Sequence, residues 1–83
     1  MNEITISLNE IPQLQQYFKV IQLFDDFDID IRSCDRKQIL DAKSIMGVMS
    51  LNLSKPVILE PKTNNREKLN QFKAVMRQFE VEV

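Results

Sequence analysis

The feature that most constrains the fold of this chain is the spacing of its apolar residues, which changes from one segment to the next. Apolar and polar residues alternate over positions 4–8, which is the period of a half-buried strand. The apolar residues that follow recur at helical spacing: Leu14, Phe18, Ile21 and Phe24. Pro12 lies just before them and suits the first turn of a helix, where a missing N–H costs nothing. The first third of the chain therefore predicts one strand followed by one helix.

A second and a third strand are predicted in the middle of the chain. Phe27, Ile29 and Ile31 alternate with charged residues, so the two-residue period returns over this stretch. The polar segment 33–36 has the composition of a turn, and residues 37–40 have that of a short strand. We expect the two strands to pair as a hairpin.

The segment 43–51, with the sequence KSIMGVMSL, predicts a short helix. Ser44 belongs to the residue types that cap helix N-termini. Val48 and Leu51 fall on one helical face, so we expect this face to be buried.

The last third of the chain predicts a fourth strand and a third helix. Residues 56–60 are mostly apolar, and Pro61 is expected to end the strand that they form. Asn64, with Glu67 three residues later, provides a start signal for the helix. Its apolar face is expected to contain Leu69, Phe72, Val75 or Met76, and Phe79.

The order of these elements, β-α-β-β-α-β-α, predicts the fold class. Strands that alternate apolar with polar residues favour an antiparallel sheet with helices on one face. We therefore expect an α+β open-faced sandwich, with a four-stranded antiparallel sheet and three helices on one face. A chain of 83 residues supports one hydrophobic core, so residues 1–83 are expected to form a single domain.

Composition excludes several classes of function. The formal net charge of -1 provides no positive field for nucleic acid, and no apolar run is long enough for a membrane helix. The one cysteine, Cys34, cannot form an internal disulfide, which favours a reducing compartment. The sequence therefore predicts a cytoplasmic protein that binds neither nucleic acid nor membranes.

Two further patterns contain residue types that metal binding or thiol chemistry uses. Asp26, Asp28 and Asp30 have the spacing of a calcium loop, but that loop would place Ile31 where glycine is needed and Lys37 where a glutamate is needed. The three aspartates fit better as the solvent face of a strand. Cys34 has no histidine to activate its thiol, because the chain contains none. We expect no metal site and no cofactor.

The segment KSIMGVMSL, with Asp41 and Ala42 ahead of it, resembles the regulatory-serine segment of the HPr family of the bacterial sugar phosphotransferase system. In that family the matching serine is phosphorylated by an ATP-dependent HPr kinase, and the modified protein binds a transcriptional regulator. The resemblance implies an HPr-like fold, with Ser44 as a site of regulatory phosphorylation. It also implies HPr kinase or a transcriptional regulator as the protein partner.

The other signature of the HPr family is a catalytic loop between the first strand and the first helix, with a histidine, an arginine and a proline. In this chain Ile11 lies near the histidine position and Gln13 near the arginine position. Isoleucine has no lone pair for phosphate, and glutamine has no charge to stabilise it. The resemblance thus implies a non-catalytic variant, similar to the catabolite-repression HPr-like proteins, although those keep more of the loop.

These observations predict a regulatory or interaction protein, a monomer or weak homodimer, that is not an enzyme. Ile45, Met46 and Met49 are expected to form an apolar patch beside Ser44 that binds a partner. Three alternatives stay open. Ser44 could be a simple helix cap beside core residues. The protein could carry phosphate on an aspartate or on Cys34, or it could be a diverged HPr-fold protein of unrelated function.

Overall fold

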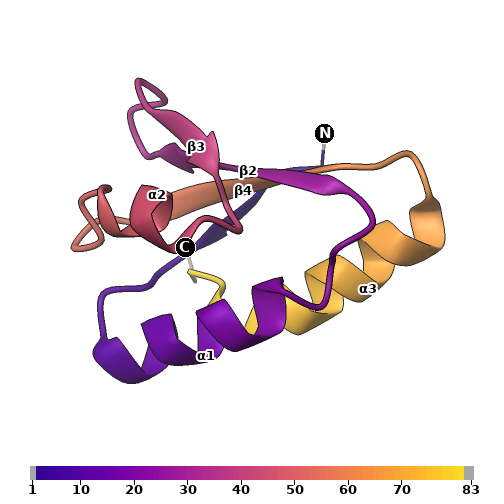
Figure 1. The fold of residues 1–83 in the computed structure, drawn as a ribbon, viewed down its shortest axis with the longest axis horizontal. Helices are drawn as coiled ribbons and strands as arrows, with labels where there is room; N and C mark the ends of the chain where they lie inside the picture. The colour runs from indigo at the N-terminus through magenta and orange to yellow at the C-terminus, as the bar shows by residue number, and fades with distance from the viewer. Residues whose placement is uncertain (1, 82–83) are drawn as a thin grey trace.

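The computed structural model describes residues 2–81, so the predicted domain, residues 1–83, extends slightly beyond them at both ends. Its four strands form one antiparallel sheet in the order β1-β4-β2-β3, with helices packed against it (Figure 1). The predicted α+β open-faced sandwich is confirmed. The elements in chain order are β1 (Ile4–Ile6), α1 (Ile11–Ile21), β2 (Asp28–Ser33), β3 (Ile39–Asp41), α2 (Ile45–Met49), β4 (Val57–Lys62), α3 (Arg66–Met76) and the 3-10 helix η1 (Arg77–Phe79).

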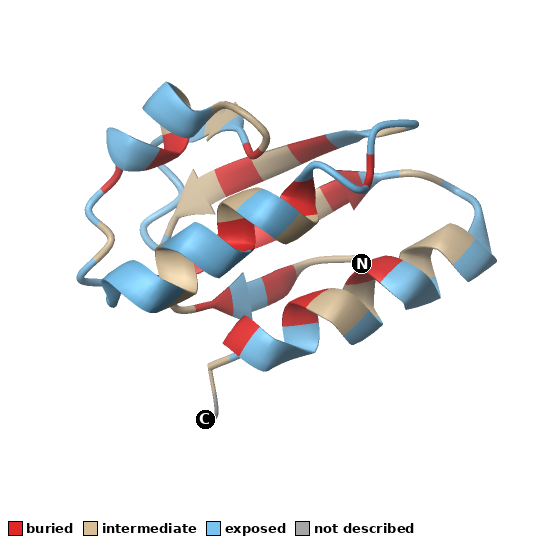
Figure 2. Ribbon diagram, turned by 60° about the horizontal axis from the view of Figure 1, so that its bottom comes forward, coloured by how far each residue is buried: buried red, intermediate tan, exposed pale blue. Residues whose placement is uncertain are grey.

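One hydrophobic core lies between the sheet and the helices. Leu59 of β4 pairs with Ile4 of β1 on one side and with Ile31 of β2 on the other, and all three are buried. Tyr17 of α1 and Phe72 of α3 are fully buried against them. Figure 2 shows the consequence for α1 and α3, whose buried and exposed residues lie on different sides of each helix.

Pro61 does not end the fourth strand, which continues to Lys62. The carbonyl of Ile29, the β2 partner of Pro61, accepts a hydrogen bond from Ala42 and therefore points away from β4. Pro61 and Ile29 are thus a non-hydrogen-bonded pair, in which the missing N–H of proline is not needed by β2. The other neighbour, β1, pairs with β4 only as far as Leu59. The sequence-based boundary was wrong because the register decides where a strand tolerates proline.

The hairpin loop is longer than the sequence predicts, and β3 is displaced toward the C-terminus. The backbone N–H of Ser33 donates to the carbonyl of Gln38 at 3.1 Å, so the residues between them form the loop. Arg36 adopts a left-handed conformation in this loop, with φ of 63°. Residues 37–38 therefore belong to the loop that closes the turn, and β3 begins at Ile39. At the other end of the hairpin, Phe27 precedes β2 instead of belonging to it.

The helix ends also differ from the predicted ones. Phe24 lies three residues beyond the end of α1, yet it is buried in the core. Phe79 belongs to η1, which continues α3 with a tighter turn. Asn65, and not Asn64, caps α3, because its side chain accepts a hydrogen bond from the backbone N–H of Lys68. In each case the apolar residue or cap type was recognised, but its place relative to the helix end was not.

Candidate functional site

The segment at the start of α1 contains none of the groups that phosphoryl transfer through histidine requires. Ile11, near the predicted histidine position, is the first residue of α1, and its side chain is 71% exposed. Gln13, near the predicted arginine position, accepts a hydrogen bond from the backbone N–H of Glu10 at 3.3 Å. Gln13 therefore completes the start of the helix, and Ile11 presents an apolar group to solvent.

Ser44 caps α2, as the sequence predicts. Its Oγ accepts a hydrogen bond from the backbone N–H of Gly47 at 3.1 Å, and the residue is half-buried. A Cβ at position 47 would lie 3.3 Å from both the Cβ and the Oγ of Ser44. Glycine is therefore favoured at position 47 because Ser44 approaches it closely, and not because the backbone there adopts an unusual angle.

The chain leading to Ser44 is anchored from two other segments. The hydroxyl of Tyr17 donates to the carbonyl of Ala42 at 2.7 Å, and the side-chain amide of Gln22 donates to that of Lys43 at 3.3 Å. The ammonium of Lys43 in turn donates to the carbonyl of Phe27 at 2.6 Å. Burial raises the pKa of Tyr17, so its hydroxyl stays protonated and keeps donating. These contacts hold the start of α2 against α1.

The outer face of α2 is apolar. Met46 is 85% exposed, Ile45 57% and Met49 56%, whereas Val48 points into the core. With Ser44 these residues form what we call the Ser44–Met49 surface. The predicted apolar patch is thus present as an exposed feature, while its binding to a partner stays a prediction.

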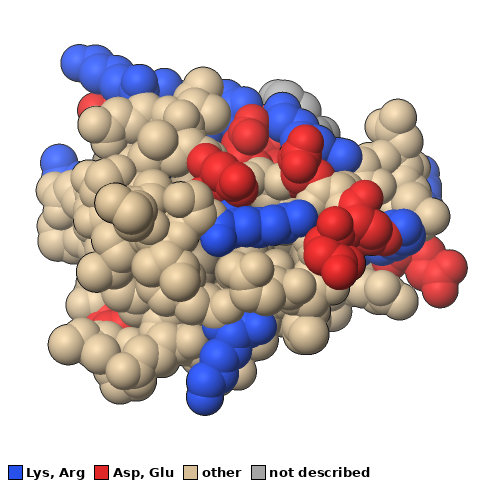
Figure 3. All heavy atoms as spheres, in the orientation of Figure 1, with Lys and Arg blue, Asp and Glu red and all other residues tan. Residues whose placement is uncertain are grey.

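No charged residue interrupts the sequence around this surface. Residues 44–54 contain no Asp, Glu, Lys or Arg, and neither do residues 11–18 of α1. Figure 3 shows the result as a broad uncharged area at the end of the molecule where Figure 1 places α2 and the start of α1. Ile11, the first residue of α1, is a further exposed apolar residue at this end of the molecule. The sequence analysis missed this contribution, although the absence of charge in residues 11–18 was a usable signal.

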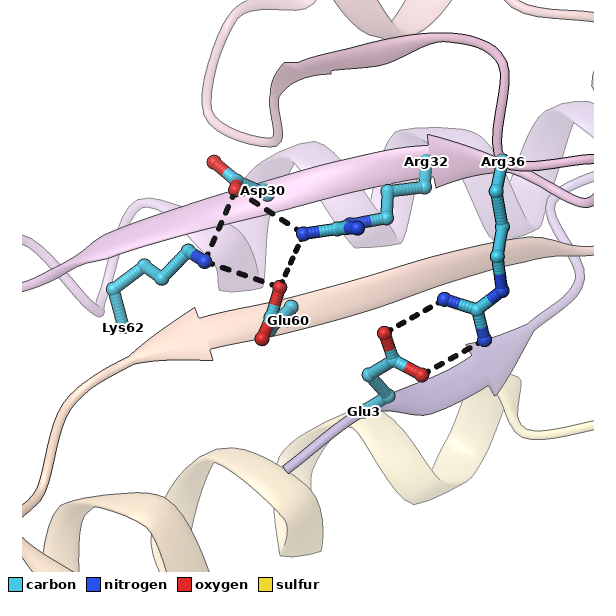
Figure 4. A network of polar contacts seen from close by, with 6 residues as sticks. All are labelled: Glu3, Asp30, Arg32, Arg36, Glu60 and Lys62. Atoms are coloured by element: carbon cyan, nitrogen blue, oxygen red, sulfur yellow. Dashed lines mark hydrogen bonds and ion pairs between the residues drawn. The ribbon is translucent and has the colours of Figure 1, made fainter. Parts of the chain in front are cut away.

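Six charged residues gather on the face of the sheet opposite the helices, where they are paired with one another (Figure 4). Arg32 meets Glu60 at 2.5 Å, and Lys62 meets Glu60 at 3.1 Å. Ile58 lies on this face of β4 between Thr5 of β1 and Arg32 of β2, and it is only 7% exposed. The face is held by ion pairs among six residues: Glu3, Asp30, Arg32, Arg36, Glu60 and Lys62. The Nε of Arg32 is buried without a hydrogen-bond partner among the described residues, but every charged group of the network is ion-paired, so we interpret the network as structural.

The three aspartates considered for calcium do not converge. Asp28 is exposed on β2, Asp30 belongs to the ion-pair network, and Asp26 pairs with Lys68 of α3. Asp26 precedes β2, so its predicted place on the strand was wrong. Within residues 2–81, no three His, Cys, Asp or Glu side chains lie close enough to hold a metal ion.

Cys34 is exposed in the hairpin loop, beside a shallow hollow that Lys37 and Lys55 also line. None of the helices in the described part of the chain has the length and apolar character needed to span a membrane.

Comparison with known proteins shows a likeness to solved structures. No family model matches the chain, and no curated protein matches it either. Among solved structures, the crystal structure of HPr-C-His from Thermoanaerobacter tengcongensis is similar, with a TM-score of 0.66 and 22% sequence identity. The match covers 94% of this chain and 93% of that one. The fold is HPr-like. In this HPr-like fold the Ser44–Met49 surface and the start of α1 lie at the same end of the molecule.

Proposed function

We propose that this protein is a non-catalytic HPr-like regulatory protein that binds a protein partner through the Ser44–Met49 surface. The observation that carries the proposal is the exposure of three large apolar side chains on a helix only five residues long. A single exposed apolar residue is ordinary, but a contiguous group on an uncharged area is typical of binding surfaces. Methionine also adapts its shape to different partners. The HPr-like fold supports a role related to the phosphotransferase system.

Phosphorylation of Ser44 would act on the same surface. Residues 44–54 contain no cation that could pair with a phosphate, and the ammonium of Lys43 is engaged with the carbonyl of Phe27. A phosphate would therefore remain available to a partner that supplies arginine or lysine. By resemblance, HPr kinase would add the phosphate and a transcriptional regulator would bind the product.

Intact-mass spectrometry after two parallel incubations tests the regulatory role. One incubation contains HPr kinase and ATP, and the other contains enzyme I and phosphoenolpyruvate. We expect one phosphate in the first incubation only, and none in the first incubation with the Ser44→Ala variant. The chain has no histidine to accept phosphate from enzyme I. Phosphate from enzyme I would contradict the non-catalytic assignment and favour a carrier with another acceptor.

The apolar contact is tested separately, with HPr kinase as the binding partner. Met46→Glu places a charge in the middle of the Ser44–Met49 surface and leaves the core untouched, since Met46 is 85% exposed. We expect calorimetric affinity for the kinase to fall at least about tenfold, the loss typical of an interface residue that matters. Ala74→Glu, an exposed change on α3, is the matched control. Equal affinity of both variants and the unaltered protein would contradict the proposal that the Ser44–Met49 surface binds the kinase.

A further inference from the structure

A second recessed surface lies where the connection between α1 and β2 runs beside α3. The hollow has a volume of about 470 Å³, within the range of natural ligand sites. It shares no lining residue with the Ser44–Met49 surface. Its walls come from two segments: residues 23–27 of the connection, and Lys68, Gln71 and Val75 of α3. The three α3 residues are spaced three and four apart, so they lie along one face of the helix.

The floor of this groove is aromatic. Phe24 packs edge-on against Phe72 with ring centroids 5.2 Å apart, and Phe27 meets Phe72 at 6.3 Å. Phe24 and Phe27 line the groove and both contact Phe72, which is fully buried and does not line it, so the floor is anchored to the core. Leu23 stands at the rim with 70% of its side chain exposed, and Val75 is half-buried opposite the connection. The groove therefore provides a rigid apolar base with an exposed leucine beside it.

The charged groups at the groove leave a net negative charge. Asp26 pairs with Lys68, whose hydrogen bond lowers the pKa of that carboxyl group. Asp25 is exposed and forms no ion pair with any residue between 2 and 81. Lys43 donates to the carbonyl of Phe27 and keeps its positive charge, but it does not line the groove, whose charged residues are Asp25, Asp26 and Lys68. Two carboxylates thus face one ammonium, and the charge of Asp25 is available to a ligand.

We propose that this groove binds a segment of a partner protein in which a leucine-like side chain lies next to lysine or arginine. The apolar side chain would pack on the Phe24–Phe27 floor beside Leu23, and the cation would meet Asp25. The groove and the Ser44–Met49 surface differ in charge, so the molecule presents one uncharged and one acidic contact. This inference goes beyond the proposed function and does not depend on Ser44.

The test uses short blocked peptides as probes and amide NMR shifts as the readout. N-acetyl-Lys-Leu-Lys-amide is titrated into the full chain at low ionic strength, with the Glu-Leu-Glu and Lys-Ser-Lys peptides as controls. We expect the Lys-Leu-Lys peptide to shift the amides of residues 23–27 and 68–75. The Glu-Leu-Glu peptide should cause no shift there, and the Lys-Ser-Lys peptide should bind several-fold more weakly.

Two matched carboxylate variants test whether the peptide's lysine contacts Asp25. Asp25→Asn should weaken binding of the Lys-Leu-Lys peptide about threefold, which is the effect of one exposed charge pair. Asp28→Asn removes an exposed carboxylate that does not line the groove, and it should leave the affinity unchanged. Leu23→Ala should weaken binding while the spectrum stays that of a folded protein, because Leu23 is mostly exposed.

Several results would overturn the proposal. Absence of shifts at the groove would show that the peptide does not bind there. Equal shifts from the Lys-Leu-Lys and Glu-Leu-Glu peptides would show that binding does not depend on charge complementarity. Equal affinity for the Lys-Ser-Lys peptide would show that the leucine side chain does not contribute to binding. Equal weakening by Asp28→Asn would show only a general acidic field, and shifts confined to residues 44–49 would assign the peptide to the other surface.

Discussion

Tyr17 is the residue that most directly joins the core to the Ser44–Met49 surface. Its ring is fully buried and lies edge-on to Phe18 and Phe79, with centroids 5.5 and 6.2 Å away. Its hydroxyl donates to the carbonyl of Ala42, two residues before the cap. A buried hydroxyl needs such a partner, because leaving it unpaired costs about 1–3 kcal/mol. The hydrogen bond from Tyr17 is thus one of the contacts that hold the start of α2 against α1.

The raised pKa of Tyr17 predicts a loss of stability at high pH. The unfolded chain releases the tyrosine proton above about pH 10, while the folded protein keeps it. The unfolded state then binds fewer protons, so the free energy of unfolding should fall by about 1.4 kcal/mol per pH unit above that point. Urea unfolding between neutral and alkaline pH measures this slope. Tyr17 is the only tyrosine, so tyrosinate absorbance reports this group alone.

Tyr17→Phe is the control for this prediction. It should cost about 1 kcal/mol at neutral pH through the lost hydrogen bond to Ala42. Its unfolding free energy should then depend less on alkaline pH than that of the unaltered protein. Equal slopes for both proteins, or tyrosinate absorbance that appears near pH 10 before unfolding, would contradict the burial of the ionising hydroxyl.

At the scale of elements, the short edge strand β1 is held from both sides. It pairs with β4 over three residues, and on its other side the N–H of Ser7 donates to the carbonyl of Phe79 at 2.8 Å. Just before β1, the carboxylate of Glu3 accepts two hydrogen bonds of 2.9 Å from the guanidinium of Arg36. This pair, visible in Figure 4, ties β1 to the hairpin loop across the sheet. The ties compensate for a strand too short to be stable alone.

The Glu3–Arg36 pair predicts a loss of stability at acidic pH. The hydrogen bond from Arg36 holds the pKa of the Glu3 carboxyl group below its ordinary value. Its stabilising contribution is therefore complete above the unfolded pKa and disappears as the pH falls through the lower, folded pKa. Glu3→Gln should reduce the free energy of unfolding at neutral pH by a small amount, because the pair is near the surface.

Denaturant unfolding of Glu3→Gln and the unaltered protein at neutral and strongly acidic pH measures this difference. It should shrink as Glu3 becomes protonated, and also at high salt. Thr5→Val changes an exposed residue of β1 without touching the ion pair, and it serves as the control. A difference that is the same at both pH values would mean that Glu3 acts through something other than its charge.

At the scale of the whole molecule, stability rests on one small core closed by aromatic residues. Phe72 is fully buried and contacts both Phe24 and Phe27, so it connects α3 to the connection after α1. A domain of this size is stabilised by only about 5 kcal/mol. Phe72→Ala should cost about 3–5 kcal/mol and leave much of the protein unfolded.

Circular dichroism during thermal and urea unfolding measures the cost of Phe72→Ala. Phe72→Leu keeps most of the apolar volume and should remain folded, with a smaller loss of stability. A fully folded Phe72→Ala variant with an unchanged unfolding midpoint would contradict the central place of Phe72 in the core.

The sequence by itself determined the order of the elements, because strand and helix periods are local properties of neighbouring residues. Residue type alone also identified Ser44 as a cap, and the absence of histidine ruled out phosphate transfer through an imidazole. The exposure of Ile45, Met46 and Met49 could be expected once Val48 and Leu51 were taken as the buried face.

Only the tertiary structure decided features that depend on segments far apart in the chain. Pro61 lies inside a strand because the register with Ile29 leaves its nitrogen without a required partner. Glu3 and Arg36 meet although 33 positions separate them, and the acidic groove exists only where residues 23–27 pass beside α3. Such contacts follow from strand register and helix packing, which the periodicity of a single segment does not contain.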